Sequence, residues 1–487
     1  MSIKAEELKI LYASSEVYPF MKTGGLADVA QSLPSAIQSM GANIRIILPN
    51  YGSLKCTDDA EVVAQFEVNH DQVKLLATKL PNTSIPVILV DCPTWFAREG
   101  NPYLNSVGEP WHDNVQRFAL FSRVISLVAL NQAYLNWSPN IVHCNDWQTG
   151  LALALLRHQG INTGLIFTIH NIAYQGVFPY ADFQSLHLPD ELWSIDTLEY
   201  YDQMCFLKAG IACCNQLNTV SPTFAKEIQT AEFGFGMDGL LRRLSEKLSG
   251  IINGIDINEW SPSEDKYISH RYDIDNLDNK VENKLEIQRD YNFQVNKNIP
   301  MLTSITRLVE QKGIDLIIAV IEKLLARDIQ IIMLGSGDEK IETALLEISR
   351  KYESKFRVIV GYDEALAHKL TAAADIYLMP SRFEPCGLNQ MYSQRYGTVP
   401  IVRSTGGLAD TVINYIDNSK IDNNATGFVF ENNHPDELLD AILKALDCYS
   451  IKQLWKEIQL NGMKQDYSWR SSAQQYLSLY EKSLQHI

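Results

Sequence analysis

The sequence Thr-Gly-Gly-Leu-Ala-Asp occurs twice in the chain, at residues 23–28 and again at residues 405–410. The first copy follows Lys22, and the second follows the stretch Glu-Pro-Cys-Gly at residues 384–387. A pair of glycines lets the backbone approach a ligand closely, and N–H groups at the start of a helix bind phosphate. A Gly-Gly pair can also simply open a helix. Two copies, with a cation beside the first, favour two similar lobes that each direct a backbone turn at a ligand.

The length and composition of the chain are typical of a soluble protein with two domains. Its 487 residues are too many for one ordinary core, and 46% are hydrophobic while 21% are charged. The formal net charge of -16 disfavours a nucleic-acid or membrane partner. No apolar run reaches the roughly 18 residues of a membrane span, and residues 1–7 resemble neither a secretory signal nor a transit peptide. We therefore expect a cytoplasmic protein.

The cysteines and histidines give no metal-binding pattern. The eight cysteines are scattered without a C-x-x-C pair, and the ten histidines are dispersed as well. This spacing favours a reduced protein over a disulfide framework and lacks the arrangement that zinc needs. We expect no metal and no cofactor.

Short apolar runs alternate with helical patterns in the first half of the chain. A helical pattern covers residues 26–40, and several of the apolar runs end in polar clusters. The expected strands are residues 8–13, 44–48, 85–90, 141–142, 164–169 and 216–220. This alternation predicts a parallel sheet covered on both faces, in which ligands bind beyond the carboxyl ends of the strands.

The second half repeats the alternation after a polar stretch. Residues 261–298 are charged and poor in aliphatic side chains, which predicts a domain boundary or an exposed connection. The strands expected after it are residues 301–305, 331–334, 357–360, 374–379 and 399–402, and the tail at 468–486 is an amphipathic helix. We expect two Rossmann-like, doubly wound α/β domains, residues 1–260 and 261–466, that face a central cleft. Two unrelated α/β domains are the alternative.

Three cations stand at predicted loop or helix starts. Lys22 precedes the first glycine turn, while Arg307 and Lys312 lie five residues apart after a strand. Three cations and two helix N-termini suit a diphosphate, although Arg307 and Lys312 can equally form a solvated charge pair. The chain has no Walker A sequence, and the Gly335-x-Gly337 pattern lacks the third glycine of a nicotinamide site.

Other polar residues also fall at strand ends. His170 ends an apolar strand, where a polar side chain is costly unless it is paired or functional. Asp146 and His143 flank a cysteine and are candidates for binding a sugar, Glu384 stands in a loop after a strand, and Cys386 is a candidate reactive thiol. Aromatic side chains that offer faces for sugar stacking, or fill the core, are Tyr18, Tyr103, Trp111, Trp137 and Trp147.

Taken in order and spacing, the motifs resemble those of the bacterial glycogen synthases and plant starch synthases. The match runs from about residue 8 to residue 480, essentially the whole chain. The matching segments are residues 22–29, 168–171, 253–256, 307 with 312–313, 380–387, 405–411 and 466–469.

The resemblance implies a retaining glycosyltransferase of the GT-B architecture. Such an enzyme transfers glucose from ADP-glucose to the non-reducing 4-hydroxyl of an α-1,4-glucan, and its terminal helix, here residues 467–487, crosses back to the first domain. Because the expected substrate contacts are divided between the two domains, we also expect that ADP and a malto-oligosaccharide together close them.

The resemblance also assigns roles to individual residues. Those expected around the reacting sugar and leaving group are His170, Asp146, Arg307, Lys312 and Glu384. Those expected to bind the donor are Lys22, Gly24, Gly25, Asn253, Tyr362, Cys386, Gly387, Leu388 and Thr405, with Tyr362 on the adenine. Those expected to contact the acceptor are Glu16, Asp28 and Tyr103.

The sequence departs from the family pattern at two places, and two alternative functions remain. Tyr392 stands where many members of the wider superfamily carry a second glutamate, and Gly-Ala-Asn at residues 41–43 replaces a common Gly-His pair. One alternative is a related GT-B transferase that uses UDP-glucose or a small acceptor. The other is a catalytically idle glucan-binding partner, which the presence of Lys22, Arg307, Lys312 and Glu384 disfavours.

Overall fold

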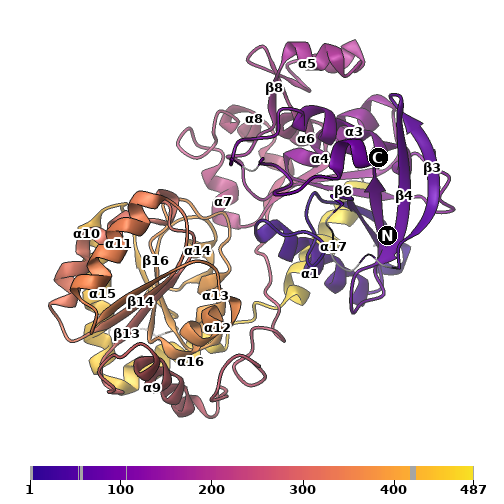
Figure 1. Cartoon of the computed structure of the whole chain (residues 1–487). Coiled ribbons are helices and arrows are strands. Elements are labelled where there is room, and N and C mark those ends of the chain that lie inside the picture. The colour runs from indigo at the N-terminus through magenta and orange to yellow at the C-terminus, as the bar shows by residue number, and fades with distance from the viewer. Residues whose placement is uncertain are drawn as a thin grey trace. The chain divides into compact units, whose positions relative to one another are not determined.

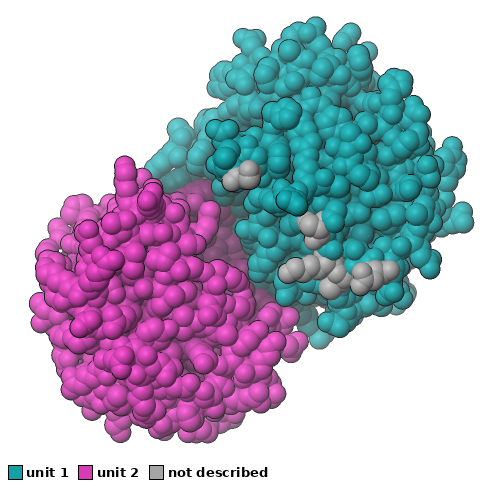
Figure 2. Space-filling view, in the orientation of Figure 1, with its two compact units in different colours: residues 1–254, 469–487 teal, residues 255–468 magenta. Residues whose placement is uncertain are grey.

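The computed structural model describes residues 4–52, 54, 57, 59–105, 107–416 and 424–485. The chain forms two compact units, shown in Figures 1 and 2. Unit 1 comprises Met1–Gly254 and Trp469–Ile487, and unit 2 comprises Ile255–Ser468. From the sequence we expected the boundaries after residues 260 and 466.

Unit 1 is built on a nine-stranded sheet in the order β12-β11-β7-β6-β1-β2-β5-β4-β3. Its strands are β1 Lys9–Ala13, β2 Asn43–Pro49, β3 Glu61–Val68, β4 Asp71–Lys79, β5 Pro86–Asp91, β6 Ile141–Asn145, β7 Gly164–Ile169, β11 Gln216–Thr219 and β12 Leu248–Gly250. The strands β12, β11, β7, β6, β1, β2 and β5 of this sheet pair in parallel, as the alternation predicted. Strands β6 and β7 are buried along their whole length. The antiparallel strands β3 and β4 were not predicted; most of β3 is exposed or half-buried, so it lacks a continuous apolar run.

Helices cover this sheet, and the last helix of the chain is one of them (Figure 1). The helices of unit 1 are α1 Gly25–Ser39, α2 Pro93–Phe96, α3 Asn114–Ala129, α4 Trp147–His158, α5 Tyr180–Ser185, α6 Phe206–Cys213, α7 Pro222–Glu227, α8 Asp238–Arg243 and α17 Trp469–Leu484. A small sheet adds β8 Val177–Pro179, β9 Glu199–Tyr200 and β10 Gln203–Cys205. Helix α17 packs against α1, β7 and β11, so it completes the core of unit 1.

Unit 2 is built on a six-stranded, all-parallel sheet in the order β15-β14-β13-β16-β17-β18. Its strands are β13 Met301–Ile305, β14 Gln330–Gly335, β15 Phe356–Val360, β16 Ile376–Met379, β17 Val399–Arg403 and β18 Phe428–Phe430. Its helices are α9 Lys280–Asp290, α10 Ile314–Leu325, α11 Glu339–Lys351, α12 Glu364–Ala373, α13 Asn389–Arg395, α14 Gly406–Thr411, α15 Pro435–Ser450 and α16 Lys452–Met463. Both units are thus doubly wound α/β folds, as predicted. Strand order reverses between β1 and β6 in unit 1 and between β13 and β16 in unit 2.

The prediction that residues 261–298 form an exposed connection is wrong. This segment folds onto unit 2, where α9 packs against α12. Lys280 is buried and donates to Ala372 O at 2.6 Å and to Thr398 Oγ1 at 2.7 Å, while Lys284 forms a buried 2.6 Å ion pair with Asp375. Part of the polar composition therefore comes from buried lysines that bond internal acceptors, while many of the other polar residues of this segment are exposed.

A buried histidine holds the beginning of this segment. The His368 ring stacks on Trp260 with centroids 3.8 Å apart, and Tyr392 stacks on the same indole at 3.9 Å. His368 Nδ1 lies 2.8 Å from Asp265, and Nε2 lies 3.8 Å from Glu364. Burial by itself lowers the pKa of His368, but the two carboxylates outweigh burial and raise it to about 9. The imidazolium is thus the folded form at neutral pH.

Replacing His368 by glutamine is expected to destabilise the protein more at pH 6 than at pH 9. The folded pKa of about 9 exceeds the ordinary value of 6.5, so the stabilisation is complete below about pH 6.5 and is lost as the pH rises through 9. We expect a loss of about 1–3 kcal/mol at pH 6, measured by denaturant unfolding.

The quantity to follow is the difference in the free energy of unfolding between the wild type and His368→Gln. This difference is needed because Lys280 gives both proteins a pH dependence of stability of the opposite sign. Burial lowers the pKa of Lys280 to about 7, so this group contributes stability that increases with pH above 7. An equal loss at pH 6 and pH 9 would contradict the assignment of a charged His368.

Candidate active site

The predicted site residues gather at the two points where strand order reverses. In unit 1 the loops after β1 and β6 hold Glu16 and Asp146, and in unit 2 the loops after β13 and β16 hold Arg307 and Glu384. Adjacent loops leave the sheet in opposite directions at such points, which leaves room for a ligand at the carboxyl ends of the strands.

The Glu16 carboxylate bonds the start of helix α1. Its Oε1 accepts from Thr23 Oγ1 at 2.6 Å and from the Tyr103 hydroxyl at 2.7 Å, and its Oε2 accepts from the backbone N–H groups of Thr23 and Gly24. Glu16 is only 3% exposed. Burial and the nearby Glu16 charge raise the pKa of Tyr103, so this phenol stays a hydrogen-bond donor. A side chain thus supplies the anion that a helix N-terminus favours.

The two glycine pairs differ in their surroundings. A Cβ atom placed on Gly24 or Gly25 would meet no atom within 4 Å. In the second copy, a Cβ on Gly406 would lie 2.0 Å from Glu384 O, and one on Gly407 would lie 2.1 Å from Cys386 O. The first pair is therefore open, whereas the second pair is needed for close packing against the loop of residues 384–386.

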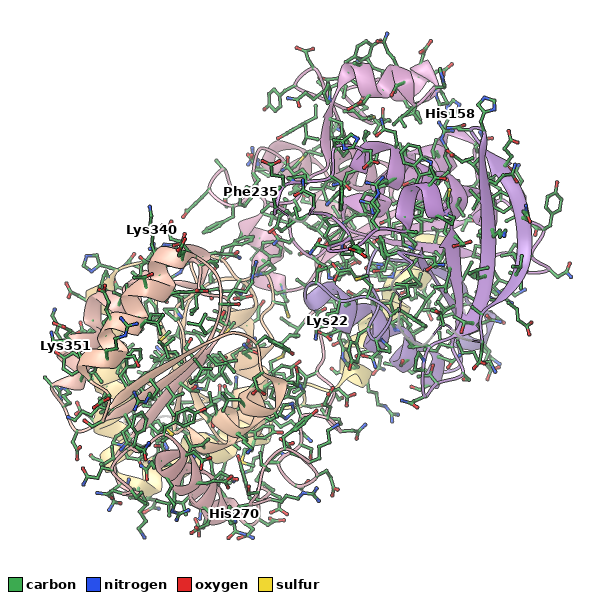
Figure 3. The ribbon with its side chains drawn as sticks, viewed as in Figure 1. Lys22, His158, Phe235, His270, Lys340 and Lys351 are labelled. Carbon is green, nitrogen blue, oxygen red and sulfur yellow. The ribbon has the colours of Figure 1, made fainter. Side chains whose placement is uncertain are left out.

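Lys22 and Asp28 flank the first glycine pair. Lys22 Nζ lies 2.8 Å from Asp28 Oδ1, and both side chains remain partly exposed; Figure 3 labels Lys22 at the start of α1. The exposed pair leaves the lysine able to exchange its partner for a ligand at little cost, since such pairs are worth about 0–1 kcal/mol.

Asp146 and His170 are adjacent in space. Asp146 Oδ1 accepts from the backbone N–H of His170 at 2.7 Å and of Asn171 at 3.4 Å. Asp146 has a φ of 56°, an uncommon conformation for a residue with a side chain. Desolvation raises the pKa of Asp146 to about 7 and lowers that of His170 to about 3. The neutral imidazole and this tuned carboxyl group are properties expected of an active site.

His143 is a core residue, so the expectation that it binds a sugar is wrong. It is 0% exposed, its Nδ1 lies 2.9 Å from the Tyr480 hydroxyl, and its Nε2 lies 2.6 Å from Thr168 Oγ1. Thr168 donates to Asn218 and therefore accepts from His143. Helix α17 thus enters a buried polar network of unit 1 through Tyr480.

In unit 2 the central feature is a partly buried ion pair. Lys312 Nζ lies 2.5 Å from Glu384 Oε2, which also accepts from Ser381 Oγ at 3.0 Å. Glu384 is 6% exposed. Gly313 follows Lys312 with a φ of 69°, and a Cβ there would lie 2.0 Å from Pro380 O, so the loops after β13 and β16 pack closely at this glycine.

Arg307 and Tyr362 are exposed near the same edge of the sheet. Arg307 follows β13, and its side chain forms no ion pair within the part of the chain that the structure describes. Tyr362 follows β15, is 77% exposed, and bonds Glu364 through its hydroxyl. An unpaired guanidinium and an open aromatic face are both available to a ligand.

Comparison with known proteins identifies the family of this chain. A model of the starch synthase catalytic domain matches residues 9–243, and a model of glycosyl transferases group 1 matches residues 284–461. The chain is 46% identical to glycogen synthase 1 of Methylococcus capsulatus, covering 98% of this chain and 97% of the relative. It is 48% identical to the glycogen synthase of Cellvibrio japonicus, covering 97% and 98%. The chain belongs to the glycogen and starch synthase family.

A solved structure supports the same conclusion. The catalytic domain of starch synthase IV from Arabidopsis thaliana, bound to ADP and acarbose, is 32% identical, with a TM-score of 0.87 over 98% of this chain and 99% of that one. The family accounts for the GT-B architecture, a nucleotide-sugar donor and a glucan acceptor. Tyr392, the departure from the wider superfamily, stacks on Trp260 in this family member.

The remaining predicted donor residues are less accessible. Cys386 is 5% exposed and Thr405 is fully buried, whereas Gly387, with a φ of 72°, and Leu388 are half-buried. Asn253 is 6% exposed, and its Oδ1 has no hydrogen-bond partner among the described residues. Alkylation of Cys386, expected from its position, therefore requires local opening first.

Sequence analysis missed several residues that shape the site. Asn145 bonds the His170 ring, Ser381 bonds Glu384, and the Ser15 hydroxyl lies 2.7 Å from that of Tyr103. Each is next to a predicted strand end, which was the available signal. Of the aromatic candidates, Trp137 and Trp147 are buried at 8% exposure and belong to the core.

Two other features are not found among the described residues. No helix in the described ranges is long and apolar enough to cross a membrane. No group of three or more His, Cys, Asp or Glu side chains among the described residues is arranged to hold a metal ion.

Replacing Lys312 by alanine is expected to lower the free energy of unfolding by about 3 kcal/mol, because it leaves the Glu384 carboxylate buried without its charge partner. The double variant with Glu384→Gln should recover most of this loss. Denaturant unfolding is the measurement.

The matched control is Lys323→Ala, which removes an exposed lysine 3.7 Å from Asp436. It should change stability by less than about 1 kcal/mol. Equal effects of the two lysine variants would contradict the structural importance of the Lys312–Glu384 pair.

Proposed function

We propose that this protein elongates an α-1,4-glucan by transferring glucose from ADP-glucose to the non-reducing 4-hydroxyl, with retention of the anomeric configuration. The observation that carries the proposal is the Lys312–Glu384 pair with the unpaired Arg307 at the strand-order reversal of unit 2. Further support comes from the ADP and acarbose in the related starch synthase IV structure.

Arg307 and Lys312 bind the diphosphate in this proposal. As the bond between sugar and phosphate breaks, negative charge grows on the diphosphate and positive charge grows on the sugar. Fixed cations are most effective where that charge develops, so the two side chains stabilise the transition state more than the ground state. Glu384, held by Ser381 and Lys312, accepts hydrogen bonds from the donor sugar.

The acceptor interacts with unit 1 in the same proposal. Tyr103 and Glu16 form one hydrogen-bonded group with the first glycine turn, and Asp146 fixes the backbone of His170. Retention without an enzyme nucleophile implies attack on the face from which the diphosphate leaves. The leaving phosphate oxygen then takes the proton of the acceptor hydroxyl. We propose that this reaction uses no metal and no cofactor.

Donor choice tests the proposed function most directly. We expect incorporation of labelled glucose into malto-oligosaccharides from ADP-glucose at a kcat/KM far above that for UDP-glucose, and the same rate in EDTA. Equal or reversed values for the two donors would refute the proposed donor. Loss of activity in EDTA that a divalent ion restores would refute the metal-free reaction.

Arg307→Ala is expected to lower kcat by about 10²-fold, the effect of removing one charge contact in a transition state. Because Arg307 is exposed, the variant should unfold like the wild type. The matched control is Arg327→Ala, an exposed arginine before the amino end of β14, which should keep its kcat. A normal kcat for Arg307→Ala would exclude Arg307 from the reaction.

A further inference from the structure

The side-chain amide of Asn145 is buried beside the His170 ring and determines which nitrogen of that ring carries the proton. Asn145, the last residue of β6, is 0% exposed. Its Nδ2 donates to Ala13 O at 2.9 Å. Since a carbonyl oxygen only accepts, this bond fixes the orientation of the amide, and Oδ1 must occupy the other position.

Asn145 Oδ1 faces two donors. It lies 2.9 Å from His170 Nε2 and accepts from the Tyr12 hydroxyl at 3.2 Å. An amide oxygen has no proton to give, so His170 Nε2 must carry the hydrogen of this bond. In a neutral imidazole the other nitrogen, Nδ1, then has a lone pair and is an acceptor.

The ring is held neutral by its surroundings. Burial lowers the pKa of His170 to about 3. The titratable groups around it are Asp146, whose carboxyl accepts from the His170 backbone, the neutral His143, and Tyr12, whose pKa burial raises. None of these places a carboxylate on a ring nitrogen of His170.

The second nitrogen is available to a ligand. None of the described residues forms a hydrogen bond with His170 Nδ1, and Nδ1 is not among the buried polar atoms that lack a partner. A ligand group that bonds it must donate a hydrogen, as a sugar hydroxyl does. A carboxylate, a phosphate oxygen or a fluorine atom would meet a lone pair instead.

We infer that Asn145 is a positioning residue that fixes the Nε2–H tautomer of His170 and thereby makes Nδ1 the acceptor for a sugar hydroxyl. The tautomer itself follows from the geometry of the free protein. The role toward a sugar hydroxyl rests on the proposed function. The two parts are therefore testable separately.

The first experiment observes the tautomer directly. Nitrogen-15 NMR of the full chain, with labelled histidine rings and His170 assigned by its loss in His170→Gln, should show a neutral ring with the proton on Nε2 at pH 7. A proton on Nδ1, or an imidazolium at pH 7, would overturn the inference. This result does not depend on any substrate, so it stands apart from a failure of the donor assay.

The second experiment replaces Asn145, whose side-chain oxygen accepts the hydrogen bond from His170 Nε2. Asn145→Asp places a carboxylate against Nε2 and should raise the pKa of His170 by about 1–3 units, and the pH profile of its ring nitrogen-15 shifts should move by the same amount. Asn145→Ala should lower kcat/KM by about tenfold through loss of one orienting hydrogen bond. An unmoved pH profile of the His170 ring in a folded Asn145→Asp protein would overturn the inference.

A matched control separates orientation from stability. Tyr480→Phe removes a buried hydroxyl bond to His143 in the same core without touching His170. It should lower the free energy of unfolding and leave the His170 tautomer and the pH profile unchanged. If Tyr480→Phe shifts the profile as Asn145→Asp does, the effect is general and Asn145 has no special role. If Asn145→Asp does not fold, the wild-type NMR result decides alone.

Discussion

Backbone N–H groups at the start of a helix need acceptors, and the two copies of Thr-Gly-Gly-Leu-Ala-Asp meet this requirement in different ways. In unit 1 the acceptor is the Glu16 side chain, which leaves Gly24 and Gly25 open. In unit 2 the Gly407 N–H donates to the carbonyls of Glu384 and Pro385, so the helix start is joined to the loop that holds the Glu384 carboxylate. One hexapeptide therefore exposes backbone in one unit and fixes a loop in the other.

Unit 2 depends further on charges that are buried together. Lys312 pairs with Glu384, Lys284 pairs with Asp375, and protonated His368 pairs with Asp265. Each pair joins segments far apart in sequence, and removing one member leaves the other charge without compensation. Arg307 belongs to none of these pairs, and its side chain forms no ion pair among the described residues, so its guanidinium is available to a ligand.

The fold was largely predictable because fully buried parallel strands such as β7 give continuous apolar runs, and glycine turns follow them. Strand β3 was missed because its faces are mostly exposed, and α9 was missed because its buried residues include Lys280 and Lys284. Polarity along a sequence does not distinguish a solvated charge from one that is paired inside. His143 and His170 likewise look equivalent in sequence, since only the tertiary partners Tyr480 and Asn145 separate a core histidine from a site histidine.

The claim that the two glycine pairs have different roles is tested most directly by comparing Gly25→Ala with Gly407→Ala in thermal unfolding and glucan elongation. A methyl group on Gly25 meets open space, so this variant should unfold at the wild-type temperature. It should also lose kcat/KM, because we propose that the ligand approaches this turn. A methyl group on Gly407 meets Cys386 O at 2.1 Å, so this variant should unfold at a clearly lower temperature. Equal unfolding temperatures for the two variants, or full activity of Gly25→Ala, would contradict the account.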